Sequence, residues 1–144
     1  MEKVQQLSIF AENRPGRLEK ITRVLGENSV NILATAIVST NGFGVIKFMV
    51  DKCELALAKL REAGFTVTLS EVLAIEMKDK PGGLHDVVQI LSEKGVNIEN
   101  ASVYVAESRK RAYLLVEVKD IAKAKQQLKN SGLTFLSARQ QGPA

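Results

Sequence analysis

Two short segments of this sequence carry the residue types best suited to bind a small charged molecule. Each has a polar residue two places before a Pro-Gly pair, and each stands where a strand is expected to turn into a helix. Free backbone N–H groups and the positive end of the helix dipole meet at such a place, which suits a carboxylate. The candidate binding residues are Asn13, Arg14, Pro15, Gly16, Arg17 and Leu18 in the first segment and Asp79, Lys80, Pro81, Gly82, Gly83 and Leu84 in the second.

The polar residue at the head of each segment determines which charged group of a ligand that segment suits. Asn13 can both donate and accept hydrogen bonds, whereas an ionised Asp79 only accepts them and so suits an ammonium group. Two further asparagines, Asn31 and Asn97, each stand between Val and Ile at the expected start of a strand. A simpler interpretation is that Asn13 and Asp79 only cap their helices and that Asn31 and Asn97 are turn residues.

Both segments belong to a repeat that covers nearly the whole chain. The motif recurs after 66 residues (81 minus 15 for its proline, 97 minus 31 for its asparagine). A period this long that occurs twice predicts two copies of one small domain, because a solenoid needs three or more short repeats. The predicted domains are residues 1–70 and 71–144.

The periodicity within each repeat predicts six elements in the order β-α-β-β-α-β. In the first repeat they are a strand over 7–11, a helix over 18–25, strands over 30–39 and 45–50 joined by a tight hairpin at Asn41-Gly42, a helix over 53–63 and a strand over 65–69. The second repeat has a hairpin two residues longer, around 107–110. With right-handed crossovers this order makes a four-stranded antiparallel sheet with helices on one face. The predicted fold class is therefore α+β, two ferredoxin-like βαββαβ domains in tandem.

Composition excludes several classes of protein. A content of 45% hydrophobic and 25% charged residues is that of an ordinary soluble globular protein, and no apolar run reaches the roughly 18 residues of a membrane span. The formal charge of +4 is modest, and we interpret the cluster Arg109-Lys110-Arg111 as a solvated loop. The single cysteine, Cys53, cannot form an internal disulfide, which fits the cytoplasm.

The sequence does not predict an enzyme or a cofactor. It has one histidine, one cysteine and no cluster with the spacing of metal ligands. Cys53 is expected to open a helix, where a thiol can be activated, but no base accompanies it and a structural role is favoured. His85, in the first turn of a predicted helix, is interpreted as an exposed helix residue.

The combined motif of each repeat resembles the ACT domain. The matching pattern is Asn/Asp-x-Pro-Gly-x-Leu, a helix, and then Val-Asn-Ile, and the resemblance extends over about residues 4–140. It implies ferredoxin-like modules that bind amino acids and regulate metabolic enzymes. The first repeat is especially similar to the serine-sensing ACT domain of bacterial phosphoglycerate dehydrogenase. A further ligand-contacting histidine of that domain corresponds to Ala11 here and to Met77 in the second repeat.

The resemblance also implies how the asparagines would act. Asn13 and a second asparagine would contact the ligand from the two sides of a domain interface. The second asparagine would be Asn31 of another copy of the chain or Asn97 of the other repeat. The predicted protein senses a free amino acid and modulates a partner enzyme or transporter. The main alternative is a ligand-free interaction or oligomerisation module, which the sequence does not separate from a sensor.

RNA binding is a minor alternative, and nucleic acid is disfavoured as a partner. Residues 41–48, Asn-Gly-Phe-Gly-Val-Ile-Lys-Phe, follow much of the third-strand signature of the RNA-recognition motif. The position of the base-stacking aromatic holds Val45, however, and the second repeat has Tyr113-Leu114-Leu115 there. Stacking aromatics carry most of this kind of recognition.

The short join between the repeats predicts association of chains. One strand is expected to end near Leu69 and the next to begin near Val72. If the two sheets paired through their second strands within one chain, the join would have to cross nearly 30 Å, at ~4.8 Å per strand. The join has about three residues, which span only ~10 Å. Two arrangements remain: pairing between two chains, or exchange of the fourth strands with a tight hairpin at Ser70-Glu71. Exposed edges and small cores favour a homodimer. The tail from Gln140 onwards is expected to fray.

Overall fold

The chain forms two compact units in a computed structural model that describes residues 3–142. Of these residues, 5–70 and 141–142 form one unit, and 3–4 and 71–140 form the other. We call them the N-terminal unit and the C-terminal unit.

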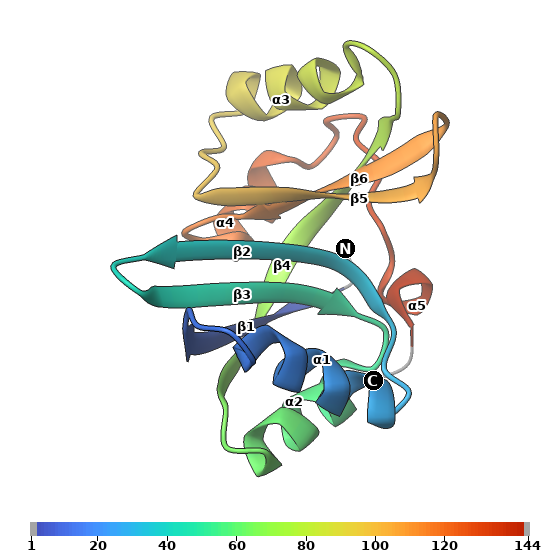
Figure 1. Cartoon of the computed structure of the whole chain (residues 1–144). Coiled ribbons are helices and arrows are strands. Elements are labelled where there is room, and N and C mark those ends of the chain that lie inside the picture. The colour runs from blue at the N-terminus through green and yellow to red at the C-terminus, as the bar shows by residue number, and fades with distance from the viewer. Residues whose placement is uncertain (1–2, 143–144) are drawn as a thin grey trace. The chain divides into compact units, whose positions relative to one another are not determined.

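The N-terminal unit is a βαββαβ domain whose two helices cover one face of its sheet (Figure 1). Its strands are hydrogen-bonded in the order β2-β3-β1-β4, and β3 is antiparallel to both β1 and β2. The elements are β1 (Val4–Glu12), α1 (Arg17–Glu27), β2 (Ile32–Thr40), β3 (Phe43–Val50), α2 (Cys53–Glu62) and the first part of β4 (Thr66–Lys78).

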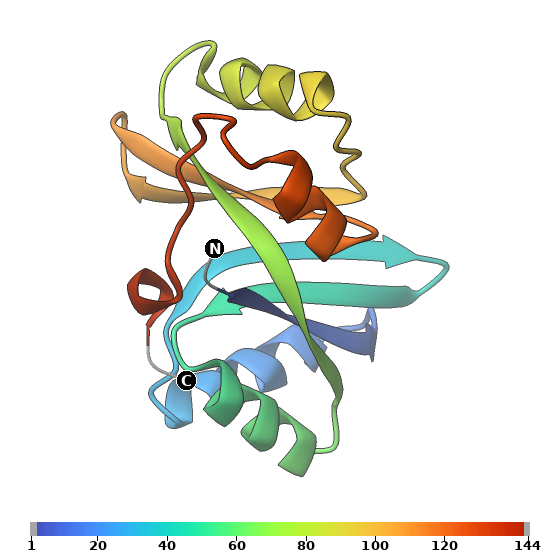
Figure 2. The same cartoon turned by 180° about the vertical axis from the view of Figure 1, so that it is seen from behind.

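The C-terminal unit repeats this order from the second part of β4 onwards (Figure 2). Its strands follow the order β4-β6-β5, all antiparallel. Its fourth strand is reduced to a bridge between Ile75 and Phe135, flanked by hydrogen bonds from Glu76 N–H to Thr134 O and from Leu136 N–H to Ala74 O. The further elements are α3 (Gly83–Glu93), β5 (Asn100–Glu107), β6 (Arg111–Glu117), α4 (Ile121–Gln127) and α5 (Ala138–Gln141).

The alternating pattern of β1 and the helical spacing of α1 build the core of the N-terminal unit. Leu7 and Ile9, two residues apart on β1, are fully buried against Ile21 and Leu25, four residues apart on α1. Leu60 of α2 completes this layer. The apolar faces therefore place both helices on the same side of the sheet.

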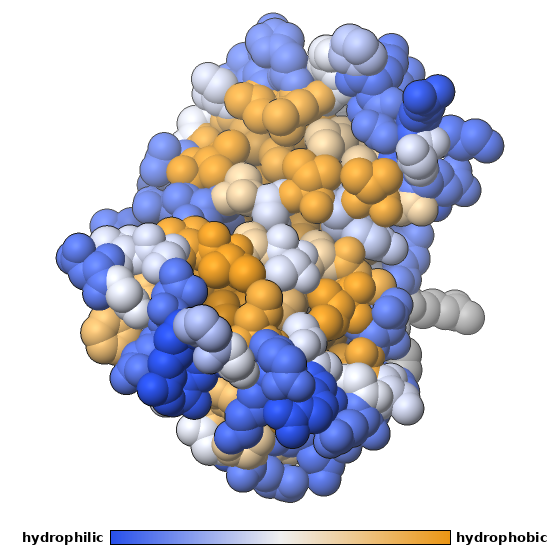
Figure 3. All heavy atoms as spheres, viewed as in Figure 1, coloured by the Kyte–Doolittle hydropathy of each residue, from blue (hydrophilic) through white to orange (hydrophobic). Residues whose placement is uncertain are grey.

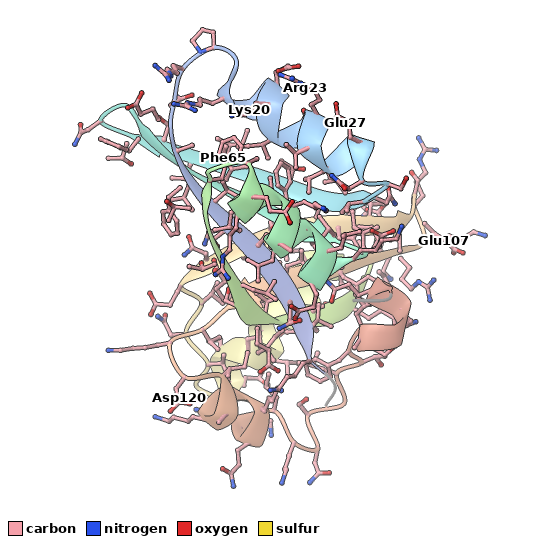
Figure 4. The ribbon with its side chains drawn as sticks, turned by 90° about the horizontal axis from the view of Figure 1, so that it is seen from below. Lys20, Arg23, Glu27, Phe65, Glu107 and Asp120 are labelled. Atoms are coloured by element: carbon pink, nitrogen blue, oxygen red, sulfur yellow. The ribbon has the colours of Figure 1, made fainter. Side chains whose placement is uncertain are left out.

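Lys20 of α1 lies over an aromatic ring at the margin of this core. The Nζ atom of Lys20 lies 5.3 Å from the centre of the Phe65 ring, and Figure 4 shows the two side chains next to each other. A cation over an aromatic face is attracted by the electrons of the ring. Phe65 follows Gly64, whose φ of +91° ends the turn after α2.

The C-terminal unit has an equivalent core from the equivalent positions. Ile75 and Leu114 of the sheet pack with Leu91 of α3 and Leu128, just after α4. The start of α4 is capped by Asp120, labelled in Figure 4, whose side chain accepts a hydrogen bond of 3.1 Å from the backbone N–H of Lys123. The predicted fold, two ferredoxin-like βαββαβ domains, is confirmed.

Three details differ from the sequence predictions. The chain does not turn at Ser70-Glu71, because β4 runs without a break through both residues. Serine is common in turns, but the strand-forming residues on both sides continue the strand here. The fourth strand of the second repeat is only a bridge. The tail is not frayed at Gln141, which ends α5 and is buried; residues 143–144 lie outside the described part of the chain.

The edge strands carry exposed apolar side chains. Ile37 and Val38 of β2 are 49% and 55% exposed, and Val103 and Val105 of β5 are 44% and 50% exposed. Figure 3 shows apolar residues over both strands. Among the described helices, none is long and apolar enough to cross a membrane.

Candidate functional site

The turn between β1 and α1 places the first candidate segment at the beginning of a helix. Gly16 occupies the N-cap position with φ +91°, a left-handed conformation that favours glycine. A Cβ atom built on Gly16 would meet no atom within 4 Å, so a ligand has room beside the backbone. The first N–H groups of an α-helix have no partner within the helix, and here they adjoin this space.

Asn13 does not cap α1, contrary to the simpler interpretation of this residue. Its side-chain Nδ2 donates a hydrogen bond of 2.9 Å to Ser39 Oγ of β2, and its backbone N–H donates one of 2.7 Å to Gly42 O. Asn13 is exposed and is held against the β2–β3 hairpin. This bond uses one of the two amide protons of the exposed side chain, so the other proton and the amide oxygen can bind a ligand.

The neighbouring side chains of this turn differ in what they contact. Arg14 pairs with Glu12 at 3.4 Å between Nε and Oε2, and both are exposed. Leu18 is 39% exposed and offers an apolar contact beside the first helical turn. The Nε atom of Arg17 is buried without a hydrogen-bond partner among the described residues.

The second segment has the same shape but a different polar network. Gly82 is the N-cap of α3 with φ +84°, again with open space at the Cβ position. The carboxylate of Asp79 accepts a hydrogen bond of 2.6 Å from Arg109 N–H, and the Asp79 N–H donates one of 3.1 Å to Lys110 O. Asp79 is therefore not a helix cap either. The Asp79 carboxylate is bound by the hairpin of its own unit. It also lies near the start of α3, where it would repel a ligand carboxylate.

The second segment is also more tightly closed than the first. A Cβ on Gly83 would lie 1.9 Å from Lys78 O, far inside van der Waals contact, so only glycine fits there. The corresponding residue of the first repeat is Arg17, which carries a long side chain. Around this point Pro81 and Lys80 are exposed, and Leu84 is 47% exposed.

Asn31 and Asn97 lie at the other end of the second strand of each repeat. The backbone N–H of Asn31 donates to Asp51 Oδ1 at 2.9 Å. From Asn31 to Ser39 is eight residues of extended chain, about 26 Å at ~3.3 Å per residue. One amino acid cannot span that distance, so the structure does not bring Asn13 and Asn31 of one unit together.

Asn97 occupies a different setting from Asn31. Its Nδ2 donates a weak hydrogen bond of 3.4 Å to Glu99 Oε1. It lines an open groove of about 760 Å³ between the end of α3 and the start of α4, together with Lys119, Lys123 and Gln127. Asn97 is thus exposed and available, but it is far along the unit from Asp79 for the same reason as in the first repeat.

Cys53 is not activated, although it opens α2 as predicted. Burial raises the pKa of its thiol to about 11, and the nearby charge of Glu54 acts in the same direction. The Sγ atom lies 3.6 Å from Val50 O and accepts a hydrogen bond of 3.2 Å from Gln141 Nε2. These contacts make it a structural thiol. In the described part of the chain no three His, Cys, Asp or Glu side chains come together as metal ligands would.

The sequence analysis missed the hairpin residues that hold the two turns. Ser39 and Arg109 each contact the polar residue that heads the motif of their own repeat. The βαββαβ order places the hairpin at the same end of the sheet as the first turn, so the topology could have directed attention to them. The identity of each partner depends on strand register, which a single sequence does not specify.

Comparison with known proteins gives a consistent result. The sequence profile of the ACT domain pair matches residues 2–141. The fold is similar to protein BT0572 from Bacteroides thetaiotaomicron, with 30% identity, a TM-score of 0.85 and coverage of 96% of this chain and 95% of that one. It is also similar to the ligand-free regulatory subunit of aspartate kinase from Thermus thermophilus, with 17% identity, a TM-score of 0.63 and coverage of 91% and 94%.

The corresponding regulatory subunit from Thermus flavus has 15% identity, a TM-score of 0.62 and coverage of 91% of this chain and 94% of that one. Among curated proteins, none is similar enough to match this sequence.

Proposed function

Because this chain belongs to the family of ACT domain pairs, we propose that it is a regulatory protein that senses a free amino acid and modulates a partner enzyme or transporter. The observation that carries the proposal is the β1–α1 turn, where open space beside the left-handed Gly16 adjoins the start of α1 and the side chain of Asn13. The similar fold of aspartate kinase regulatory subunits supports an enzyme as the partner.

The ligand carboxylate would bind the backbone N–H groups from Arg14 to Leu18. The remaining amide groups of Asn13 would orient it, since Ser39 already fixes the side chain. Asn31 lies too far along β2 to take part within the same unit, so either an Asn31 from a second copy of the chain or Asn97 of the other repeat would complete the site. The Asp79 turn would bind more weakly, because its carboxylate is engaged by Arg109 N–H and repels a second carboxylate.

An Asn31 from a second copy implies a homodimer, and we propose the edge strands as its interface. In the part of the chain that the structure describes, β2 and β5 end the strand order, so each has one side without a neighbouring strand. Their exposed apolar residues, such as Ile37 and Val105, would be buried by pairing. Light scattering should give twice the chain mass of 15.7 kDa, and Ile37→Lys should shift it toward the monomer. A clean monomer at tens of micromolar for the parent would contradict this interface.

Calorimetry of the full chain with each of the twenty amino acids tests the function. We expect one or a few of them, at millimolar concentration, to give a saturable heat and to raise the melting temperature. If none does, the sensing function is wrong, and the interaction module with its apolar edges takes its place. We do not propose RNA binding, because the cross-strand neighbour of Phe10 on β3 is Val45, which has no ring to stack on a base.

We place the protein in the cytoplasm, where its single buried thiol stays reduced. This fits a sensor of free metabolites, and the residues proposed for binding need no metal or cofactor.

A further inference from the structure

An open pocket of about 420 Å³ lies in the C-terminal unit where the end of β4 meets the start of β6. We call it the basic pocket. Its charged and apolar lining consists of Glu76, Met77, Lys78, Lys110, Arg111 and Leu133. Three cationic side chains stand against one carboxylate, so the lining carries two positive charges in excess.

Strand register forces two of these cations together. Lys78 is directly opposite Arg111 in the β4–β6 pair, which puts both side chains on the same face. Like charges directly opposite each other destabilise a sheet. Glu76, two residues before Lys78 and on that same face, lies 3.7 Å from Arg111 Nη1 and offsets only part of the repulsion. Glu107 is opposite Arg111 on β5 but does not line the pocket.

The guanidinium of Arg111 is only partly satisfied. Its Nε atom is buried, and among the described residues it has no hydrogen-bond partner. A buried donor without a partner is unfavourable, and proteins rarely keep one. The Cζ atom of Arg111 lies 6.0 Å from the centroid of the Tyr113 ring.

Two hydrogen bonds hold the basic residues in place. The Asp79 carboxylate and the Asp79 N–H bind the backbone of Arg109 and Lys110, so the turn after β4 is tied to the β5–β6 hairpin. Lys78 and Lys110 therefore stay on the same side of the unit. The cluster that the sequence analysis interpreted as a solvated loop contributes two of its three residues to the pocket.

We propose that the basic pocket binds the phosphoryl group of a small metabolite. A dianion would neutralise the two charges in excess and would accept hydrogen bonds from the exposed part of the Arg111 guanidinium, whose side chain is 43% exposed, and from the ammonium groups of Lys78 and Lys110. This site does not depend on the proposed amino-acid site, whose backbone donors belong to the helix starts.

The first repeat offers an internal comparison. The equivalent pocket, of about 360 Å³, has Phe10 where Glu76 stands and Phe43 where Arg111 stands. Its single cation, Arg17, also has a buried Nε without a partner among the described residues, but it is matched by the single carboxylate of Glu12, so only the excess of charge distinguishes the two pockets. The basic pocket alone should therefore bind phosphate.

The test is a titration of the 15N-labelled full chain with inorganic phosphate, at an ionic strength held constant with potassium chloride. We expect saturable shifts of the backbone amides of 76–78, 110–111 and 132–134, with a dissociation constant on the order of 1 mM. Acetate, with one charge, should bind more weakly. Arg111→Gln should weaken phosphate binding roughly 10- to 150-fold. The matched control Lys94→Gln, which removes one charge at the far end of α3, should not.

Phosphate shifts that fail to saturate, or that spread evenly over both units, would overturn the proposal, as would acetate binding equal to that of phosphate. If Arg111→Gln does not fold, Lys110→Gln, on the exposed hairpin, provides the same test. Binding that survives in the folded variants at full strength would place the phosphate elsewhere and refute the basic pocket.

Discussion

Replacing Gly83 by alanine should open the turn between β4 and α3. Two effects oppose each other at this position, which begins α3 without a left-handed φ. Alanine favours a helix over glycine by about 0.5–1 kcal/mol. Its Cβ would lie 1.9 Å from Lys78 O, whereas a close carbon–oxygen contact is about 3.3 Å, so the backbone must move by roughly 1.4 Å.

The steric effect should win. Overpacking of this kind costs about 1–3 kcal/mol and more where backbone is the obstacle, and the movement also pulls Asp79 away from Arg109 N–H. We expect a net loss of about 2–3 kcal/mol in the free energy of unfolding, which is a large part of what a small domain has. Urea unfolding of the full chain, followed by circular dichroism, measures it.

Gly26→Ala is the matched control for this substitution. Gly26 lies inside α1, has no left-handed φ, and a Cβ there would meet nothing within 4 Å. The same chemical change should therefore stabilise the protein by about 0.5–1 kcal/mol. If Gly83→Ala is as stable as the parent, or stabilises it as Gly26→Ala does, the close approach of Lys78 O is not a real constraint and the reasoning about this turn is refuted.

Three further predictions concern the ligand, the thiol and the tail. Asn13→Ala should weaken amino-acid binding by about 1.5–3 kcal/mol, roughly 10- to 150-fold by calorimetry, while stability changes little because its hydrogen bond is exposed; unchanged binding in the folded variant would refute its role. Burial raises the pKa of Cys53 from 9.0 to about 11, so the thiol contributes its full stability below pH 9. As the pH rises to 11, the unfolded thiol ionises first, and the free energy of unfolding should fall by at most about 2–3 kcal/mol. A Cys53→Ala variant with the same pH profile would contradict this. Gln141→Ala should lower stability by about 2–3 kcal/mol, since it leaves Gln5 N–H, Gln5 O and Val50 O without their partner; urea unfolding that matches the parent would show that the tail is not needed.

The fold could be predicted because the repeat and the local patterns agree with each other. The hairpin at Asn41-Gly42 has φ of +53° and +82°, which is the conformation that this pair of residues favours. Gly64 ends the turn after α2, as its position implied. Such signals are local and need no knowledge of the partner strands.

The errors occurred where tertiary contacts overrode a local preference. Asparagine is a good helix cap, but the hairpin offers Asn13 the hydroxyl of Ser39 instead. A tight hairpin at Ser70-Glu71 belonged to one of the two predicted arrangements of the join, whereas one strand, β4, runs through both residues. The buried Gln141 could not be foreseen, since a polar tail usually frays and its partners, the backbone of Gln5 and Val50 and the Cys53 thiol, are far away in the sequence.

The places where the two helices begin could be predicted, whereas the polar contacts around them could not. Pro-Gly at a strand end indicated the helix starts, and both glycines indeed occupy the N-cap. That the Asp79 carboxylate is bonded to Arg109 depends on the longer hairpin of the second repeat, whose register the sequence leaves open.

The most direct test of amino-acid sensing is a backbone amide spectrum of the 15N-labelled full chain recorded with each of the twenty amino acids at millimolar concentration. The account predicts that at least one amino acid produces saturable shifts that are largest at Gly16, Arg17 and Leu18, where the N–H groups would receive the carboxylate. It would be contradicted if no amino acid moved these signals, or if the saturable shifts lay away from the helix starts.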